Sequence, residues 1–193
     1  EGILEGVENT NYKITTIKNK FILTIFEKRV NEEELPFFIE LQHHLSKKNI
    51  KCPRPIADKK NNYVNVMKEK KCVIMSYLEG EKLHDVKPKH CLQLGEEIAN
   101  MHLCTSDFTL SRKNNLDQSN WKSIFRKCQS AENHKYYQFY TLIENELIFI
   151  EKNWPKNLPS GVIHADIFQD NVFYIKEKLT GLIDFYFACN DYY

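Results

Sequence analysis

A His-x-Asp-x-x-x-x-Asn pattern near the carboxyl end of the chain carries the side chains that could do chemistry. It comprises His164, Asp166 and Asn171, and Asp184 follows thirteen residues after the asparagine. Apolar, strand-like residues flank these groups, so we expect the polar side chains to point into a cleft. Phosphoryl transfer needs a carboxylate that orients the attacking hydroxyl, and an amide oxygen and a second carboxylate that hold Mg²⁺. The pattern therefore predicts Asp166 as the catalytic carboxylate and Asn171 and Asp184 as metal ligands.

The histidine of this pattern has two chemical uses, and the sequence leaves both open. Its imidazole is neutral near pH 7 and could accept a proton, or it could brace the loop by hydrogen bonding. We count His164 with Asp166 in the catalytic set and favour bracing. A short polar pattern can also arise by chance, and a lone aspartate in a strand can be structural. The strand-like flanks and the spacing to Asp184 favour a catalytic site.

The elements that must position these groups are mainly strands before residue 77. Alternating apolar residues predict a hairpin over 11–30 and a second strand pair over 63–77. Between the two pairs, apolar residues recur at helical spacing over 32–48, directly after Asn31 as the N-cap. The first half of the chain is therefore predicted to be a small sheet with one helix.

Helical patterns dominate after residue 77. Apolar stripes predict helices over 88–103, 121–129 and 136–154, and short strands follow at 161–163, 172–175 and 182–185. This order is typical of an α+β protein with two lobes. We expect a small antiparallel-sheet N-lobe at residues 1–77 and a mainly helical C-lobe at 78–193, with the linker at 76–80.

The composition excludes several classes of function. Lys and Arg number 27, Asp and Glu number 26, and the formal net charge is +1. This balance gives no electrostatic reason to expect nucleic acid or a membrane surface as a partner. The longest apolar runs are too short to span a bilayer. The six cysteines include no Cys-x-x-Cys pair, so a zinc ribbon has no support and we expect reduced thiols and a cytoplasmic protein.

The polar pattern and the Ile-Asp-Phe that follows it resemble the aminoglycoside phosphotransferase and choline kinase superfamily. Members of that superfamily have the protein-kinase-like fold. Protein kinases usually show His-Arg-Asp and Asp-Phe-Gly. The His-Ala-Asp at 164–166 and the Asp-Phe-Tyr at 184–186 therefore indicate the small-molecule branch. The resemblance implies ATP as the co-substrate and Mg²⁺ as the cofactor.

The same resemblance implies where the nucleotide binds. The segment 2–12 resembles the loop that covers the phosphates, with Gly6 and Asn9 as its nucleotide-binding residues, although it could also be an ordinary turn. The segment 73–80 resembles the hinge between the lobes, where backbone groups of Ser76, Tyr77 and Leu78 would pair with adenine. An edge strand followed by a turn is the alternative for the hinge.

One position departs from the superfamily pattern. The third strand of these enzymes carries a phosphate-binding lysine, and Thr24 occupies that position here. Lys28 points to the same side of the strand and could substitute, or it could be a solvated charge at the strand end. Glu33 or Glu34 could pair with Lys28, or both could be acids that the helix dipole favours.

Several stretches resemble bacterial homoserine kinases of the aminoglycoside-phosphotransferase-like type, namely 5–12, 21–30, 35–38, 161–166 and 181–189. This resemblance implies transfer of the ATP γ-phosphate to the hydroxyl of L-homoserine, which gives O-phospho-L-homoserine for threonine biosynthesis. Another small-molecule kinase, acting on choline, ethanolamine or an aminoglycoside, would share the catalytic residues. A pseudokinase-like binding module is the non-enzymatic alternative. The oligomeric state is left open.

The ends of the chain suggest a fragment. The first residue is Glu1 rather than methionine, and members of the resembled family have an extra helix and strand before this region and more helices after it. We therefore expect a kinase-like fold that is truncated at both ends and that lacks part of the acceptor pocket.

Overall fold

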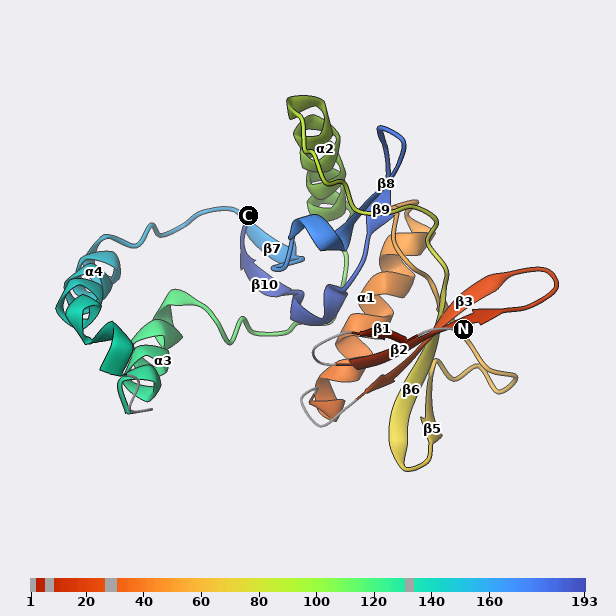
Figure 1. Cartoon of the computed structure of the whole chain (residues 1–193), viewed down its shortest axis with the longest axis horizontal. Coiled ribbons are helices and arrows are strands. Elements are labelled where there is room, and N and C mark those ends of the chain that lie inside the picture. The colour runs from red at the N-terminus through yellow and green to blue at the C-terminus, as the bar shows by residue number, and fades with distance from the viewer. Residues whose placement is uncertain (1–2, 6–8, 27–30, 131–133) are drawn as a thin grey trace.

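An antiparallel sheet and one helix make up the first part of the chain (Figure 1). The computed structural model describes residues 3–5, 9–26, 31–130 and 134–193. In this part the sheet order is β1-β2-β3-β6-β4, with β5 also pairing with β6. The strands are β1 (Ile3–Glu5), β2 (Asn9–Thr15), β3 (Lys20–Phe26), β4 (Pro55–Ile56), β5 (Val64–Met67) and β6 (Lys70–Ser76). The predicted hairpin and the second strand pair are confirmed, whereas β1 and β4 were not predicted.

The helix that packs on this sheet begins as the sequence predicts. A 3₁₀ turn η1 (Glu32–Glu34) leads into α1 (Leu35–Lys47), and the Asn31 side chain accepts a hydrogen bond from the Glu33 N–H at 3.1 Å. Asn31 therefore satisfies one of the donors that a helix start leaves open. Leu35 and Ile39 face the sheet and pack with Phe26, Val73 and Met75.

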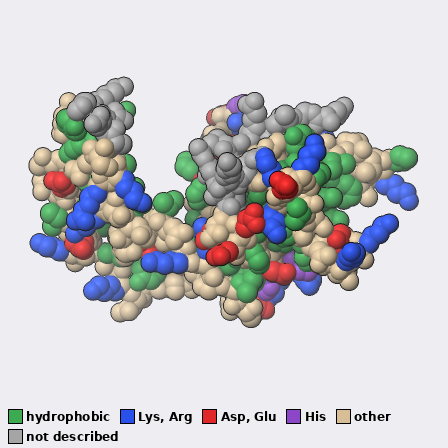
Figure 2. Space-filling model, turned by 90° about the horizontal axis from the view of Figure 1, so that it is seen from below, with side chains coloured by type: hydrophobic (Ala, Val, Ile, Leu, Met, Phe, Trp, Pro, Cys, Tyr) green, Lys and Arg blue, Asp and Glu red, His purple; other side chains and the backbone are tan. Residues whose placement is uncertain are grey.

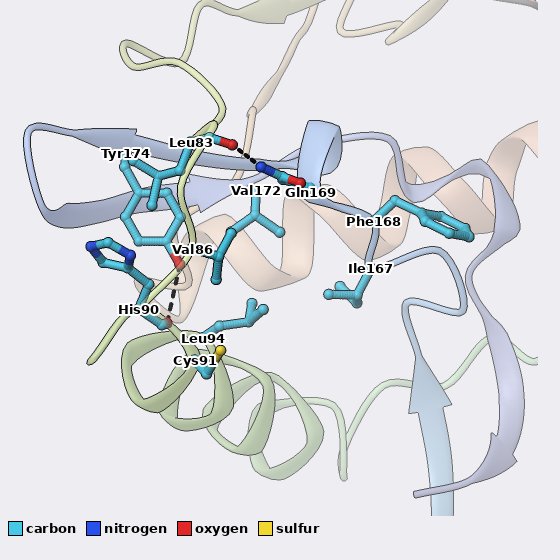
Figure 3. Close-up of a pocket in the computed structure, with 10 residues that line it drawn as sticks. All are labelled: Leu83, Val86, His90, Cys91, Leu94, Ile167, Phe168, Gln169, Val172 and Tyr174. Atoms are coloured by element: carbon cyan, nitrogen blue, oxygen red, sulfur yellow. Dashed lines mark hydrogen bonds between the residues drawn. The ribbon is translucent and has the colours of Figure 1, made fainter. Parts of the chain in front are cut away.

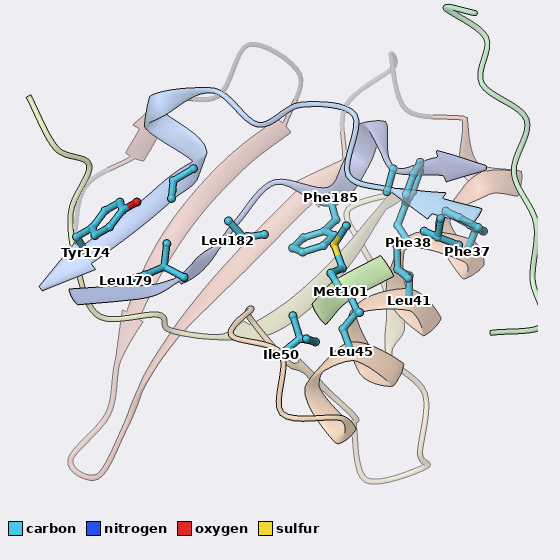
Figure 4. Close-up of a cluster of buried hydrophobic side chains, with 13 residues drawn as sticks. Phe37, Phe38, Leu41, Leu45, Ile50, Met101, Tyr174, Leu179, Leu182 and Phe185 are labelled. Atoms are coloured by element: carbon cyan, nitrogen blue, oxygen red, sulfur yellow. The ribbon is translucent and has the colours of Figure 1, made fainter. Parts of the chain in front are cut away.

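A neighbouring face of α1 belongs to a larger core (Figure 4). There Phe38, Leu41 and Leu45 meet Met101 of α2 (Pro88–Cys104) and Phe185. One helix thus contributes to two buried clusters, one with the sheet and one with the second half of the chain. This arrangement holds the sheet against the segment that carries the predicted catalytic residues.

The helices of the second half are confirmed with small changes in length. They are α2, α3 (Gln118–Ser130) and α4 (Tyr140–Asn153), with a 3₁₀ segment η2 (His134–Phe139) before α4. In Figure 1, α3 and α4 lie together and apart from the sheet. The apolar stripe predicted on α2 was partly wrong, because Leu92 is 65% exposed while Glu97 and His90 are buried.

Two short strand pairs frame the predicted catalytic residues. Strand β7 (Ser160–Ile163) pairs with β10 (Cys189–Tyr192), and β8 (Val172–Ile175) pairs with β9 (Lys178–Leu182). The strand predicted over 182–185 was wrong beyond Leu182. Asp184 has a left-handed backbone with φ 63°, which ends the extended run, and the 3₁₀ turn η4 (Phe185–Phe187) follows. This change of direction lets apolar residues flank Asp184 without continuing the strand.

The division of the chain at residue 77 stays a prediction, although β6 does end at Ser76. From there the linker runs beside β8, where Glu81 and Tyr174 exchange backbone hydrogen bonds of 3.0 and 2.9 Å. Figure 2 shows acidic and basic side chains interspersed on the face that it presents. Among the described helices, none is both long and apolar enough to cross a membrane.

Candidate active site

The loop after β7 brings Asp166 and Asn171 together. The Asn171 side-chain N–H group donates to Asp166 Oδ2 and to the Asp166 backbone carbonyl, both at 2.9 Å. Ala165, between His164 and Asp166, has a left-handed backbone with φ 64°, which is unfavourable for alanine. A strained residue at this point is typical of a site whose geometry is held by its surroundings. The loop therefore fixes the Asp166 carboxylate next to the Asn171 amide.

His164 links this loop to the segment before Asp184. Its Nε2–H donates to the Ile183 carbonyl at 2.9 Å, and its Nδ1 accepts the Asp166 N–H at 3.3 Å. The side chain is only 2% exposed, and its ring packs against Phe185. Burial lowers the pKa of His164 to about 4, although its hydrogen bond to Ile183 opposes the shift. Both ring nitrogens are thus engaged and the imidazole is neutral, which fits the predicted bracing role rather than that of a base.

A backbone hydrogen bond connects Asn171 to the residue that precedes Asp184. The Ile183 N–H donates to the Asn171 carbonyl at 3.0 Å, so Ile183 is held on both sides, by Asn171 and by His164. Asp184 follows directly. Because the Asn171 side-chain nitrogen is used by Asp166, its amide oxygen is the atom left to act as a ligand. Hydrogen bonds therefore join Asp166 to Asn171, and Asp184 directly follows Ile183, which is bonded to Asn171.

The surroundings of Asp166 shift the pKa of its carboxyl group in opposing directions. Burial raises the pKa of Asp166 above its ordinary value, the hydrogen bond from Asn171 lowers it, and the nearby Asp170 charge raises it further. Burial also raises the pKa of the Tyr186 phenol, and the Asp184 charge adds to that rise. Tyr186 therefore remains neutral beside the predicted metal ligand.

The position of the superfamily lysine holds a neutral side chain. Thr24, in the middle of β3, is 3% exposed, and its hydroxyl donates to Asn11 Oδ1 of β2 at 2.7 Å. Asn9, at the start of β2, is also buried, and its Oδ1 accepts no hydrogen bond from the described part of the chain. Gly6 and Lys28 lie outside the described residues, so their predicted roles stay predictions.

One of the two acids that could pair with Lys28 has a partner among the described residues, while the pairing with Lys28 stays a prediction. The Glu34 carboxylate lies 3.0 Å from a guanidinium nitrogen of Arg112, which belongs to the loop after α2. Glu33 is exposed, and its backbone N–H is bound by Asn31. Glu34 thus has an ion-pair partner in the second half of the chain.

Two of the backbone N–H groups in the predicted hinge already form hydrogen bonds within the fold. The Ser76 N–H donates to the Arg54 carbonyl at 2.8 Å, and the Tyr77 N–H donates to the Lys20 carbonyl at 3.3 Å. Both groups are therefore used within the fold. Leu78 comes after the last of these bonds, so its N–H is the donor that the described hinge leaves for a ligand.

The chain is similar to known proteins along its whole length. The profile of the phosphotransferase enzyme family matches residues 1–193. The chain belongs to this family. It is 44% identical over 193 residues to a homoserine kinase of Bartonella tribocorum and 41% identical over 193 residues to one of Bartonella henselae. Both matches include 100% of this chain and 60% of the relative, so the chain spans about 60% of the length of these curated relatives.

The fold is shared with solved phosphotransferases. The structure of amicoumacin kinase hAmiN, in complex with AMP-PNP, Ca²⁺ and Ami, matches with a TM-score of 0.73 at 16% identity. That match covers 99% of this chain and 60% of the other. The bilobal, protein-kinase-like α+β fold predicted from the sequence is therefore confirmed.

An apolar cavity lies beside the loop that follows β7 (Figure 3). It has a volume of about 190 Å³ and lies between residues 83–86, the start of α2 and residues 167–169. Its lining includes the apolar residues Leu83, Val86 and Leu94. The predicted site residues Asp166, Asn171 and Asp184 do not line it. We therefore do not include it in the site for phosphates and metal.

The sequence did not predict two polar contacts between segments that lie far apart along the chain. Glu97 of α2 is 7% exposed and accepts the Lys51 N–H at 2.8 Å. Arg112 contacts Glu34 as described above. Glu97 falls on the helical stripe that includes His90 and Met101, so a charged residue at a buried helical position was the available signal. Nothing in the sequence around Arg112 indicated its partner.

Proposed function

We propose that this chain forms the nucleotide-binding and catalytic core of a homoserine kinase. In that reaction the γ-phosphate of ATP is transferred to the side-chain hydroxyl of L-homoserine, giving O-phospho-L-homoserine. The proposal of phosphoryl transfer is carried by one observation, the hydrogen-bonded network that joins Asp166 to Asn171 and, through Ile183, to Asp184. Identity of 41–44% to curated homoserine kinases along the whole chain supports homoserine as the acceptor.

Asp166 is assigned to the acceptor hydroxyl. A carboxylate at this place aligns the hydroxyl with the phosphorus atom and accepts its proton as the new bond forms. The hydrogen bond from Asn171 limits the rotation of the carboxylate, so it supports alignment as well as ionisation. Because the transition state of phosphoryl transfer is loose, we expect positioning to contribute more than base strength.

Asn171 and Asp184 are assigned to Mg²⁺. An amide oxygen and a carboxylate are hard oxygen donors, and Mg²⁺ is commonly held by few protein ligands together with phosphates and water. The engaged nitrogen of Asn171 leaves an oxygen for this purpose, which fits the metal. When bound, the metal would neutralise charge on the phosphates.

The nucleotide is assigned to the hinge and the sheet. We propose that adenine pairs with the backbone at Leu78, near Ser76 and Tyr77. The loop around Gly6, with Asn9 and Lys28, is assigned to the phosphates by resemblance to the superfamily. Localisation in the cytoplasm, where ATP and reduced thiols are abundant, is part of the proposal.

An acceptor screen tests the function. ADP release from ATP is measured for the complete gene product that carries this sequence, with homoserine, choline, ethanolamine and an aminoglycoside in parallel. We expect release with homoserine and formation of O-phospho-L-homoserine, detected by mass spectrometry. An Asp166→Ala variant serves as the control for contaminating kinases.

Each other outcome has a clear meaning. Release with choline, ethanolamine or the aminoglycoside alone would replace homoserine by another acceptor and keep the chemistry. Binding of Mg·ATP without release for any acceptor would support the pseudokinase-like module instead.

A further inference from the structure

Arg112 makes contacts on two sides that the catalytic network does not include. It belongs to the loop between α2 and α3, and its side chain is 14% exposed. On one side it lies 3.0 Å from Glu34 at the start of α1, and its guanidinium lies 5.1 Å from the centre of the Phe38 ring. A buried guanidinium with a carboxylate partner has a well-defined position, because its planar donors fix the geometry.

On the other side Arg112 holds the segment that follows Asp184. One guanidinium nitrogen donates to the Ala188 carbonyl at 3.2 Å and is 3.4 Å from the Phe187 carbonyl. The backbone adds two bonds, since the Arg112 N–H donates to Asn190 Oδ1 at 2.9 Å and the Asn190 N–H donates to the Arg112 carbonyl at 2.8 Å. Arg112 thus contacts Phe187, Ala188 and Asn190, which come three, four and six positions after Asp184.

The segment between these contacts needs support. Asp184 adopts a left-handed backbone, which aspartate tolerates less readily than glycine, and a 3₁₀ turn follows it at once. Ile183 fixes the segment on its upstream side by its bonds to Asn171 and His164. Arg112 is the charged group that fixes it downstream, and Tyr186 packs edge-on against Phe38 of α1 between these points.

We propose that Arg112 is a positioning residue that couples the start of α1 to the segment carrying Asp184. The placement of α1 then sets the direction in which the Asp184 carboxylate is presented, and a shift of α1 changes the affinity for the metal. The inference rests on the proposed role of Asp184 as a metal ligand. It extends that role to a control of the metal site by Glu34, Arg112 and α1.

The test uses Glu34→Gln, which removes the charge of the pair but keeps its size. Binding of a non-hydrolysable ATP analogue to the complete gene product is measured by calorimetry over a series of Mg²⁺ concentrations. We expect the Mg²⁺ concentration at half-maximal binding to rise about tenfold, as for the loss of other groups that orient a metal ligand. Amide exchange over 185–188 should become faster without metal, since the carbonyls there are held less firmly.

Matched variants separate positioning from general stability. Glu32→Gln removes an exposed acid of the same turn and should change neither measurement. Arg112→Lys keeps the charge but loses the planar donors, so we expect it to change both, while Arg126→Lys on the exposed face of α3 should change neither.

The inference would be overturned if Glu34→Gln and Arg112→Lys lowered the unfolding temperature yet left the Mg²⁺ requirement and the amide exchange of 185–188 as in the wild type. A failure of the proposed function looks different. In that case homoserine is not phosphorylated, while the variants still change the Mg²⁺ requirement for nucleotide binding and the exchange of the segment, which supports the positioning role.

Discussion

Gly181 lies on β9, three residues before the predicted metal ligand Asp184, and packs closely against another part of the backbone. Its backbone φ is +154°, which side chains rarely adopt, and a Cβ there would lie 2.3 Å from the Lys51 carbonyl oxygen and 2.8 Å from the Lys51 carbonyl carbon. Both atoms belong to the backbone, so they cannot swing aside. The next residue, Leu182, donates its N–H to the same carbonyl at 2.8 Å.

The magnitude of a Gly181→Ala change follows from these contacts. A strained backbone contributes about 1–3 kcal/mol, a forced overlap about 1–3 kcal/mol and a weakened buried hydrogen bond about 1 kcal/mol. We expect a loss of roughly 3–7 kcal/mol of unfolding free energy. For a protein of this size, each kcal/mol lowers the unfolding temperature by about 2–4 °C, so the unfolding temperature falls by roughly 6–28 °C.

Gly95 supplies a control for the same substitution. It lies in α2, and a Cβ there would have no neighbour within 4 Å. Gly95→Ala should therefore stabilise the protein by up to about 1 kcal/mol, as alanine does inside an exposed helix. Thermal and urea unfolding of both variants and the wild type are compared. If Gly181→Ala stayed within about 1 kcal/mol of the wild type, the close approach of Lys51 to β9 would be wrong.

Three further changes test the site itself. Asp166→Ala should lower turnover by about 10²–10⁴-fold with nucleotide affinity nearly unchanged, and normal turnover would remove Asp166 from its role. Asp184→Ala should weaken nucleotide binding in the presence of Mg²⁺ but hardly in its absence, by calorimetry; equal weakening in both would contradict metal ligation. His164 has a folded pKa of about 4, below its usual value of 6.5, so the unfolded state binds more protons between these values and stability falls as the pH falls. His164→Gln should abolish about 2 kcal/mol of the stability lost between pH 7 and pH 5, and an identical loss in the variant would argue against a neutral, buried His164.

Local signals in the sequence were sufficient for the elements around the site. Asn31 caps the helix start as expected, because capping depends on the two residues that follow it. The polar residues of 164–171 meet for a similar reason, since a short loop between two strands leaves them few other positions. Asn171 and Asp166 are only five residues apart, and the hydrogen bond between them needs no distant segment.

Contacts between distant segments were not predictable in the same way. The role of Glu34 was left open, and its partner Arg112 lies far along the chain, where neither helical nor strand periodicity relates the two. Strand β10 was missed because Cys189–Tyr192 has no alternation of apolar and polar residues, and its pairing with β7 defines it. The end of β9 was misplaced because an apolar run does not reveal a left-handed residue such as Asp184.

The departure at Thr24 and the ion pair of Glu34 have one physical explanation. A lysine at the Thr24 position would place a charge in a site that is 3% exposed, and it would need an acid within reach. Thr24 instead forms a neutral hydrogen bond with Asn11, which requires no acid. The start of α1 is then free to use its acid elsewhere, and Glu34 pairs with Arg112. The charged link between α1 and the catalytic segment therefore passes through the loop after α2 rather than through the centre of the sheet.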